Sequence, residues 1–258
     1  MQNSIFSTLF IGQNLVKLSE VNSTNTYLKE LVSKSEPLIE GTVIMADHQF
    51  AGRGQKDNIW YSKAGKNLTF SIYLKPSFLA VSNQFILNMV ICLGIVDALK
   101  PILGNDSKIK WPNDIYFKNN KLGGILIENS TKGYQLKESI IGIGLNVNQK
   151  DFPESLSRVT SISNVLFKDY NLNDLLIQIC QNIESRYLQL KAGNEELLKK
   201  DYLKSLYRLE EQHLFEINKQ KITGTIKGTN ESGKLLLQTE ECLKELDLKE
   251  VTFLFNRI

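Results

Sequence analysis

The chain has 258 residues, of which 42% are hydrophobic and 23% charged, and its formal net charge is +3. This composition is that of an ordinary globular protein, and the charge is too small and too evenly spread to indicate a nucleic-acid-binding face. The three cysteines are scattered and odd in number, which argues against a disulfide framework, and the two histidines lie too far apart for a zinc site.

The N-terminal residues lack a basic segment followed by an apolar one, so we predict no signal peptide. The longest apolar run, near Phe85–Leu99, is interrupted by Asn88 and Asp97 and is too short to span a bilayer. We therefore expect a cytoplasmic protein that has no membrane partner.

The first half of the chain alternates between strand and helix patterns. Capping residue types precede the first helix, for which Ser23 or Asn22 is the expected N-cap. Pro101 and Gly104 are expected to close the last helix of this half. The predicted elements are a strand at 15–18, a helix at 24–33, strands at 41–47 and 67–74, and a core helix at 85–99.

The second half begins with strands and then changes to helices. Strand patterns occupy 109–111, 115–117, 122–128 and 139–147, and helical patterns occupy 172–191 and 195–206. After His213 the pattern changes to short strands at 214–218, 221–229, 234–239 and 250–255, with a hairpin signal at 229–233. We predict two domains, 1–208 and 209–258, and expect the small one to pack against the large one because it is too short for a sizeable core.

The loop Gly52-Arg-Gly-Gln-Lys-Asp57 invites comparison with phosphate-binding loops. It lacks the third glycine of a dinucleotide fingerprint and the Gly-Lys-Ser/Thr of a P-loop. A Gly-Arg-Gly segment can still offer backbone N–H groups and a guanidinium to an anion. An exposed flexible loop explains the same residues equally well.

The segment from Lys110 to Glu128 concentrates charge and glycine. It contains Lys110-Trp-Pro-Asn-Asp114 and, seven residues later, Lys121-Leu-Gly-Gly124. Lysine is rarely buried without a partner, so each lysine either faces water or meets a negative group. The glycine pair after Lys121 would let a ligand lie against the chain, although spacing alone favours a solvated lysine.

Other polar residues have an ordinary structural explanation beside a functional one. Trp60 is a packing anchor or a stacking face for a base. Asn146 is a strand-end residue or a polar group in a pocket. Thr24 and Asn25 are most simply helix-capping residues.

Taken together, these motifs have the order and approximate spacing found in one known family. They resemble the biotin protein ligases over about Ser19 to Asn148, and the short strands after His213 are similar in layout to that family's C-terminal SH3-like domain. The motifs are Ser23-Thr-Asn25, Gln49-x-x-Gly-Arg-Gly54, Lys110-Trp-Pro-Asn-Asp114, Lys121-Leu-Gly-Gly124 and Gly142-Ile-Gly-Leu-Asn146.

The resemblance implies an α/β (α+β) fold, with a mixed, mainly antiparallel sheet backed by helices and a small C-terminal SH3-like β-barrel. It implies that ATP and biotin form biotinyl-5′-AMP, with Mg²⁺ accompanying the nucleotide, and that a lysine of a biotin carboxyl carrier protein then attacks the adenylate. About twenty residues precede the Ser-Thr-Asn segment, too few for a helix-turn-helix domain, so a monofunctional ligase without DNA as a partner is expected. The oligomeric state stays open between monomer and homodimer.

The same resemblance implies roles for individual residues. Ser23, Thr24 and Gln49 hydrogen-bond the ureido ring, and Lys121 and Arg53 are the catalytic cations near the carboxylate and the α-phosphate. Asp114 either orients a lysine, organises Mg²⁺ or is structural. The implied biotin-binding positions are Ser23, Thr24, Gln49, Gly52, Arg53, Gly54, Gln55, Lys121, Gly124 and Gly142, with Gly123 and Gly144 lining the channel, and the implied adenylate-binding positions are Arg53, Trp60, Lys121 and Asn146.

The chain departs from the family pattern in the glycine-rich loop. Many members have Gly-Arg-Gly-Arg-x-Gly, whereas Gln55 and Asp57 stand here at the second arginine and the last glycine. A neutral Gln holds an anion less strongly than Arg, unless Lys56 substitutes for it. These departures motivate one alternative, a non-catalytic biotin-binding adaptor. The shared fold keeps a second alternative open, a lipoate or octanoate ligase or transferase. We also expect Phe50–Asn58 to be mobile until ligand binds.

Overall fold

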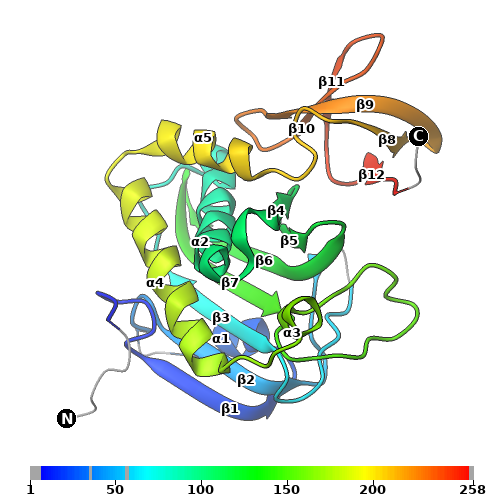
Figure 1. Ribbon diagram of the computed structural model, residues 1–258. Coiled ribbons are helices and arrows are strands. Elements are labelled where there is room, and N and C mark those ends of the chain that lie inside the picture. Colours follow the sequence, from blue (N-terminus) through cyan, green and yellow to red (C-terminus); the bar gives the residue numbers. More distant parts are fainter. Residues whose placement is uncertain (1–6, 35–36, 56–57, 256–258) are drawn as a thin grey trace.

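A seven-stranded sheet forms the centre of the molecule in the computed structural model, which describes residues 7–34, 37–55 and 58–255 (Figure 1). Its strand order is β1-β2-β3-β7-β6-β5-β4, and only β1 and β2 pair in parallel. The predicted mixed, mainly antiparallel sheet is therefore confirmed. The strands are β1 (Leu15–Val21), β2 (Val43–Gln49), β3 (Leu68–Leu74), β4 (Ser107–Lys110), β5 (Asp114–Phe117), β6 (Asn120–Lys132) and β7 (Gln135–Leu145).

The two faces of this sheet have different roles, because successive side chains on a strand point to opposite sides. One face carries Phe70, Ile72, Ile141 and Ile143 into the main hydrophobic core. The other face holds a smaller cluster around Leu28 of α1 (Thr24–Val32), built from Ile44, Tyr73 and Ile140. Beyond that cluster the second face presents small and polar residues, and this is where the functional residues lie.

Three helices build the main core on the first face (Figure 1). They are α2 (Phe85–Leu103), α4 (Leu172–Lys191) and α5 (Glu195–Ser205). The sequence predicts that Pro101 and Gly104 close the first of these, but α2 continues through Pro101. Proline there lacks the backbone N–H that would bond the carbonyl four residues earlier, yet the helix continues to Leu103, and Gly104 at φ 67° ends it.

The helical stretch Val81–Asp106 is longer than the apolar run predicted near Phe85–Leu99. By length and composition it is apolar enough to cross a membrane. However, 67% of its most apolar window is buried inside the fold, as in the core helix of a globular protein. Its apolar residues are covered by α4 and by the sheet.

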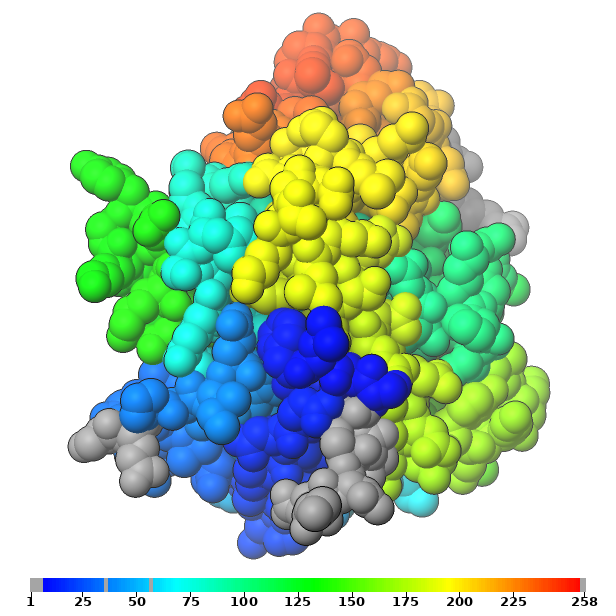
Figure 2. All heavy atoms as spheres, turned by 90° about the vertical axis from the view of Figure 1, so that its left-hand side faces the viewer, coloured from blue at the N-terminus to red at the C-terminus, as the bar shows by residue number. Residues whose placement is uncertain are grey.

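The N-terminal segment is fixed to the helical face by one buried carboxylate. Glu184 of α4 accepts backbone N–H groups of Leu9, Phe10 and Ile11 at 2.6, 2.8 and 2.9 Å. Figure 2 shows this dark-blue segment lying against the yellow helices. The carboxylate satisfies donors that would otherwise be buried without partners, which places the start of β1 at the sheet edge.

The C-terminal residues form a five-stranded sheet in the order β11-β10-β9-β8-β12, next to α5 (Figure 1). Its strands are β8 (Gln212–Ile217), β9 (Gln220–Thr229), β10 (Leu235–Gln238), β11 (Leu243–Leu246) and β12 (Val251–Phe253). The predicted hairpin between β9 and β10 is confirmed, whereas β11 and the short helix α3 (Ile162–Leu166) were not predicted. Trp111 donates its indole N–H to the carbonyl of Gly233 at 2.9 Å, so the two sheets are joined beside the Trp-Pro turn. The division at 208/209 stays a prediction.

Candidate active site

A pocket of about 240 Å³ opens on the second face of the large sheet, between the start of α1, the glycine-rich loop and the turn between β4 and β5. Five separate segments of sequence meet there, and Leu248 of the C-terminal unit contributes to the wall. Most of the predicted site residues line it: Ser23, Thr24, Gln49, Arg53, Gly54, Gln55, Trp60, Asp114, Lys121, Gly124, Gly142 and Gly144.

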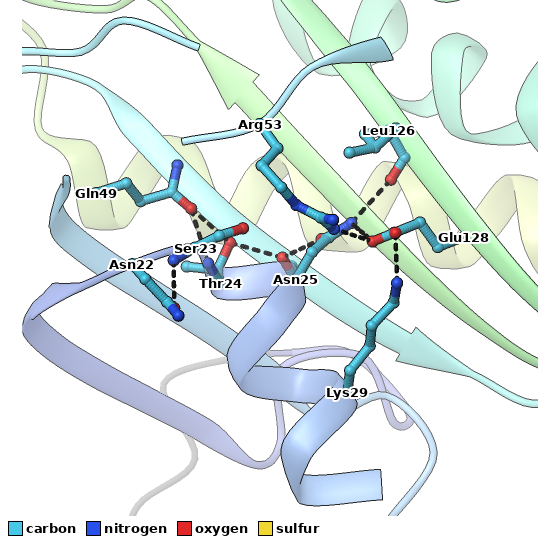
Figure 3. Close-up of polar contacts among 10 residues, drawn as sticks. Asn22, Ser23, Thr24, Asn25, Lys29, Gln49, Arg53, Leu126 and Glu128 are labelled. Carbon is cyan, nitrogen blue, oxygen red and sulfur yellow. Dashed lines mark hydrogen bonds and ion pairs between the residues drawn. The ribbon is translucent and has the colours of Figure 1, made fainter. Parts of the chain in front are cut away.

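One end of the pocket is a network of neutral hydrogen-bonding groups (Figure 3). Gln49 accepts both the backbone N–H of Thr24, at 2.8 Å, and its hydroxyl, at 3.0 Å. The Ser71 hydroxyl lies 2.6 Å from both Thr24 Oγ1 and Asn25 Oδ1. Ser23 is the N-cap of α1, as predicted, but its side chain makes no capping hydrogen bond. These groups suit a small polar heterocycle that both donates and accepts.

Two glycines on β7 form the floor of the pocket. A Cβ on Gly142 would overlap the Asn25 amide, and a Cβ on Gly144 would overlap the indole of Trp60. Gly142 and Gly144 lie two residues apart on one strand and therefore share the pocket face. The groups that approach the backbone of this Gly-Ile-Gly strand are the protein's own Trp60 and Asn25.

The other end of the pocket carries the ion pair of Lys121 with Asp114. Lys121 Nζ lies 2.6 Å from Asp114 Oδ1, and both side chains lie within 3.5 Å of the position of a Cβ on Gly124. Lys121 and Gly124 are three residues apart and would face opposite sides of a regular strand. A bulge in β6, where Ile115 pairs with Gly123 but Tyr116 pairs with Lys121, turns the lysine to the pocket face.

Lys110 also lines the pocket, and among the described residues it has aromatic neighbours rather than an ion-pair partner. Its ammonium lies 4.7 Å from the ring centre of Phe253 and 5.4 Å from that of Tyr116. Burial lowers the pKa of Lys110, nearby Asp114 opposes this effect, and Lys121 adds to it. This environment favours an anion in the pocket, because a second negative charge would relieve the mutual repulsion of the two lysines.

Arg53 reaches the pocket from the glycine-rich loop. Its guanidinium forms a 2.6 Å ion pair with Glu128 on β6 while the residue still lines the pocket (Figure 3). Backbone hydrogen bonds from Gly54 to Asn58 and from Trp60 to Gly52 close the loop. Lys56 and Asp57 lie outside the described residues, and the mobility of this loop stays a prediction.

Three predicted site residues lie behind the lining. Asn146 is buried below the floor, where its Nδ2 donates to Thr160 O at 3.2 Å. Gly52 and Gly123 pack against backbone atoms, of Trp60 and Gly144 respectively. Two buried polar atoms at this end, Trp60 Nε1 and Asn146 Oδ1, have no hydrogen-bond partner within the described chain. Such atoms are costly unless something pairs with them.

Several lining or neighbouring residues were not predicted. The period of two along a strand could have identified Glu128, which follows Gly124 and Leu126 on the same face of β6. Sequence alone gave no signal for Leu248 or Ser71, because only the fold brings them to this place. The residues missed include Asn25, Ser71, Lys110, Trp111, Asn113, Glu128 and Leu248.

A metal ion would find few protein ligands here. Within residues 7–34, 37–55 and 58–255, no group of three His, Cys, Asp or Glu side chains could hold one. Asp114 is the carboxylate on the described pocket wall, and it is already paired with Lys121. A divalent cation at this site would therefore depend on ligands supplied by a bound phosphate.

Comparison with known proteins identifies the family. The pattern of the Biotin/lipoate A/B protein ligase family matches residues 18–146, the stretch that contains every motif around the pocket. The chain belongs to this family. The match ends at Asn146. It therefore includes Thr24 and Gln49 of the polar end, the glycine-rich loop and the Lys121–Asp114 pair.

Biotin/lipoate ligase relatives resemble the chain over nearly its whole length. The Bifunctional ligase/repressor BirA of Bacillus spizizenii is 30% identical over 254 residues, which cover 93% of this chain and 74% of the relative. The biotin–[acetyl-CoA-carboxylase] ligase of Mycobacterium tuberculosis is 25% identical over 85% of this chain and 81% of the relative. A structure of the biotin protein ligase from Aquifex aeolicus in complex with biotin and ATP is 32% identical in sequence, with a TM-score of 0.78. The similarity covers 93% of this chain and 97% of that one.

Proposed function

We propose that this chain is an ATP-dependent ligase that activates biotin as biotinyl-5′-AMP and transfers the biotinyl group to a lysine of a biotin carboxyl carrier protein. The observation that carries the proposal is the different polarity of the two ends of this pocket. Neutral donors and acceptors on Thr24 and Gln49 lie at one end, and the Lys121 ammonium lies at the other. A ureido ring and a carboxylate at opposite ends of one ligand match that arrangement.

The first chemical step needs two anions to meet. A biotin carboxylate oxygen attacks the α-phosphorus of ATP, the bond to the bridging oxygen breaks, and pyrophosphate leaves. Lys121 and Arg53 would offset the charge that accumulates on the phosphoryl oxygens, because preorganised cations stabilise a transition state more than water does. The bulge in β6 holds Lys121 in place before substrate arrives.

The second step transfers the acyl group. The neutral amine of the carrier lysine attacks the acyl carbon of biotinyl-5′-AMP, a proton leaves the nitrogen, and AMP departs with the oxygen that joined it to the acyl group. Asp114 would orient the incoming amine or Lys121. Mg²⁺ would accompany the nucleotide phosphates, which supply the ligands that the pocket wall lacks.

The adenine would lie at the Trp60 end of the pocket. Trp60 offers an aromatic face beside Lys121, whose ammonium is 5.9 Å from the ring centre. The unpaired Trp60 Nε1 and Asn146 Oδ1 could bond to a purine edge and its exocyclic amine after a small rearrangement. Asn146 lies behind the lining, so this role requires movement of the Trp60 loop.

The test is a reaction of purified chain with biotin, ATP and Mg²⁺, followed by addition of a carrier domain. We expect pyrophosphate release that depends on biotin, an enzyme-bound biotinyl-5′-AMP, and a labelled carrier lysine. Reaction with lipoate or octanoate but not with biotin would move the proposal to the sister enzymes. Tight biotin binding without pyrophosphate release would leave a binding protein.

A second measurement needs no carrier. Ligands that bind the native state raise the unfolding midpoint by mass action. We expect biotin with ATP to raise it more than either ligand alone, and lipoate in place of biotin to have little effect.

A further inference from the structure

Glu128 accepts hydrogen bonds from three side chains, although no sequence motif around the pocket assigns it a role. Its carboxylate accepts Lys29 Nζ at 2.5 Å, Arg53 Nη2 at 2.6 Å and Asn25 Nδ2 at 2.8 Å. Its side chain is 22% exposed, so water reaches it only partly. Lys29 and Arg53 both pair with this one carboxylate, although a single cation would neutralise it. Of the two, Arg53 also lines the pocket.

The environment of Glu128 keeps it ionised. Burial raises its pKa, but the hydrogen bonds from Lys29, Asn25 and Arg53 together outweigh burial, so the pKa of Glu128 is lowered. The carboxylate is therefore negative throughout the neutral range and remains a partner for Arg53.

The arginine depends on this carboxylate for a connection to the sheet. In the described part of the chain, the ion pair with Glu128 is the contact recorded for its guanidinium. The loop itself is closed by backbone bonds and by the Arg53–Ile59 bridge, which join the loop to itself. Glu128, by contrast, lies on β6, four residues after Gly124, which lines the pocket.

A continuous hydrogen-bonded path joins Glu128 to the polar end of the pocket (Figure 3). Asn25 donates to Glu128, and its Oδ1 faces Ser71, which lies 2.6 Å from Thr24 Oγ1 as well. A serine hydroxyl has a single proton, so Ser71 donates either to Asn25 or to Thr24. A ligand that engages Thr24 would favour one of these two acceptors and so would reach the Asn25 amide, which also donates to the carbonyl of Leu126 at 3.3 Å.

We propose that Glu128 is a positioning residue, which holds the Arg53 guanidinium at the rim of the pocket and couples it through Asn25 to occupancy of the polar end. The role rests on the proposed function for its effect on rate. Arg53 keeps guanidinium N–H groups that the carboxylate does not use, and these face an anion that enters the pocket. Holding a charged group in advance removes the cost of ordering it when substrate binds.

The first test compares Glu128→Ala and Glu128→Gln with the matched variant Lys29→Ala. Lys29 also pairs with Glu128 but does not line the pocket. We expect kcat/KM for biotin-dependent pyrophosphate release to fall about tenfold in Glu128→Ala and less in Glu128→Gln, which keeps an acceptor oxygen. Lys29→Ala should stay within about twofold of the parent, and all three variants should remain folded, which far-ultraviolet circular dichroism checks.

The second test asks whether Glu128 acts through Arg53. If it does, Arg53→Ala and Glu128→Ala are not additive, and the double variant is about as slow as Arg53→Ala alone. Additive losses, or an unchanged kcat/KM in Glu128→Ala, overturn the proposal. A loss in Lys29→Ala as large as in Glu128→Ala also overturns it, because general charge at the cluster then explains the effect.

A third measurement does not depend on catalysis. Trypsin cleaves after arginine only when the backbone around it is free to move, so cleavage between Arg53 and Gly54, followed by mass spectrometry, reports how firmly Arg53 is held. We expect cleavage at least about fivefold faster in Glu128→Ala than in the parent or in Lys29→Ala. Equal rates refute the holding role even if the protein proves to have no ligase activity, whereas a parent that makes no adenylate refutes only the proposed function.

Discussion

The two cations of the pocket are held in different ways. Lys121 projects from β6, where a bulge fixes its direction and Asp114 on the neighbouring strand receives its ammonium. Arg53 projects from a loop, and its position depends on Glu128, which is 75 residues further along the chain. The sheet therefore determines the position of the lysine, and one ion pair determines that of the arginine.

This difference separates a rigid part of the site from an adjustable one. A side chain on a paired strand keeps its position through the ladder even when its side-chain partner is removed. A side chain on a loop loses its position when its one anchor is lost. The predictions that follow test this contrast, beginning with the largest expected effect.

Lys121→Ala should slow biotin-dependent pyrophosphate release by roughly 10²–10³-fold, because a preorganised cation at a developing charge contributes about that much. The unfolding midpoint should change little, since the ion pair is partly exposed. Stopped-flow or steady-state pyrophosphate release measures the rate.

Lys137→Ala is the matched control for this variant, because Lys137 forms a 3.4 Å ion pair with Glu138 on the same sheet but outside the pocket. It should leave the rate unchanged. A Lys121→Ala enzyme that keeps its full rate would falsify the assigned role.

Thr24→Val should weaken biotin binding by roughly ten- to a hundredfold, because it removes from the polar end the hydroxyl that contacts both Gln49 and Ser71. Isothermal titration calorimetry measures the affinity. Thr69→Val is the control, since Thr69 is as buried but donates to Ala46 O and does not line the pocket. Equal losses in the two variants would mean that the polar end does not recognise biotin.

Asp114→Asn tests the rigid half of the contrast. Because the bulge still directs Lys121 into the pocket, we expect the adenylation rate to fall only about three- to tenfold, less than in Lys121→Ala. If Asp114 also organises Mg²⁺, the loss should grow as the Mg²⁺ concentration is lowered, which a titration of the rate against Mg²⁺ shows. A loss as large as that of Lys121→Ala at every Mg²⁺ concentration contradicts the view that the sheet alone places the lysine.

The smallest effect concerns pH. The pKa of Glu128 is lower in the folded chain than its unfolded value of about 4.3. Its ionised form therefore stabilises the fold fully above that pH, and the contribution is lost as the pH falls through the folded pKa. The free energy of unfolding should be larger for the parent than for Glu128→Gln at pH 7, and this difference should shrink below about pH 4. Urea titrations at several pH values measure it, and a difference that stays constant down to pH 3 contradicts the ion-pair account.

The sequence alone predicted most of the helices and strands, because periodic apolar residues and caps are local signals. The helix at 172–191 and the strand at 67–74 agree almost residue for residue with α4 and β3. The sequence prediction was wrong or silent where tertiary contacts outweigh local preference. Pro101 did not end α2, and β11 has a mostly polar, exposed sequence that carries little strand pattern of its own.

The sequence by itself determined which residue types the pocket contains, since the ordered motifs from Ser23 to Asn146 fall within the family match. Only the tertiary structure decided how those residues are used. The bulge that turns Lys121 toward Asp114 arises from pairing between strands, and the contact of Arg53 with Glu128 joins two segments that no local pattern relates. Local sequence sets the conformation of each element, but the direction of a side chain depends on the register and proximity of elements that meet only in the folded chain.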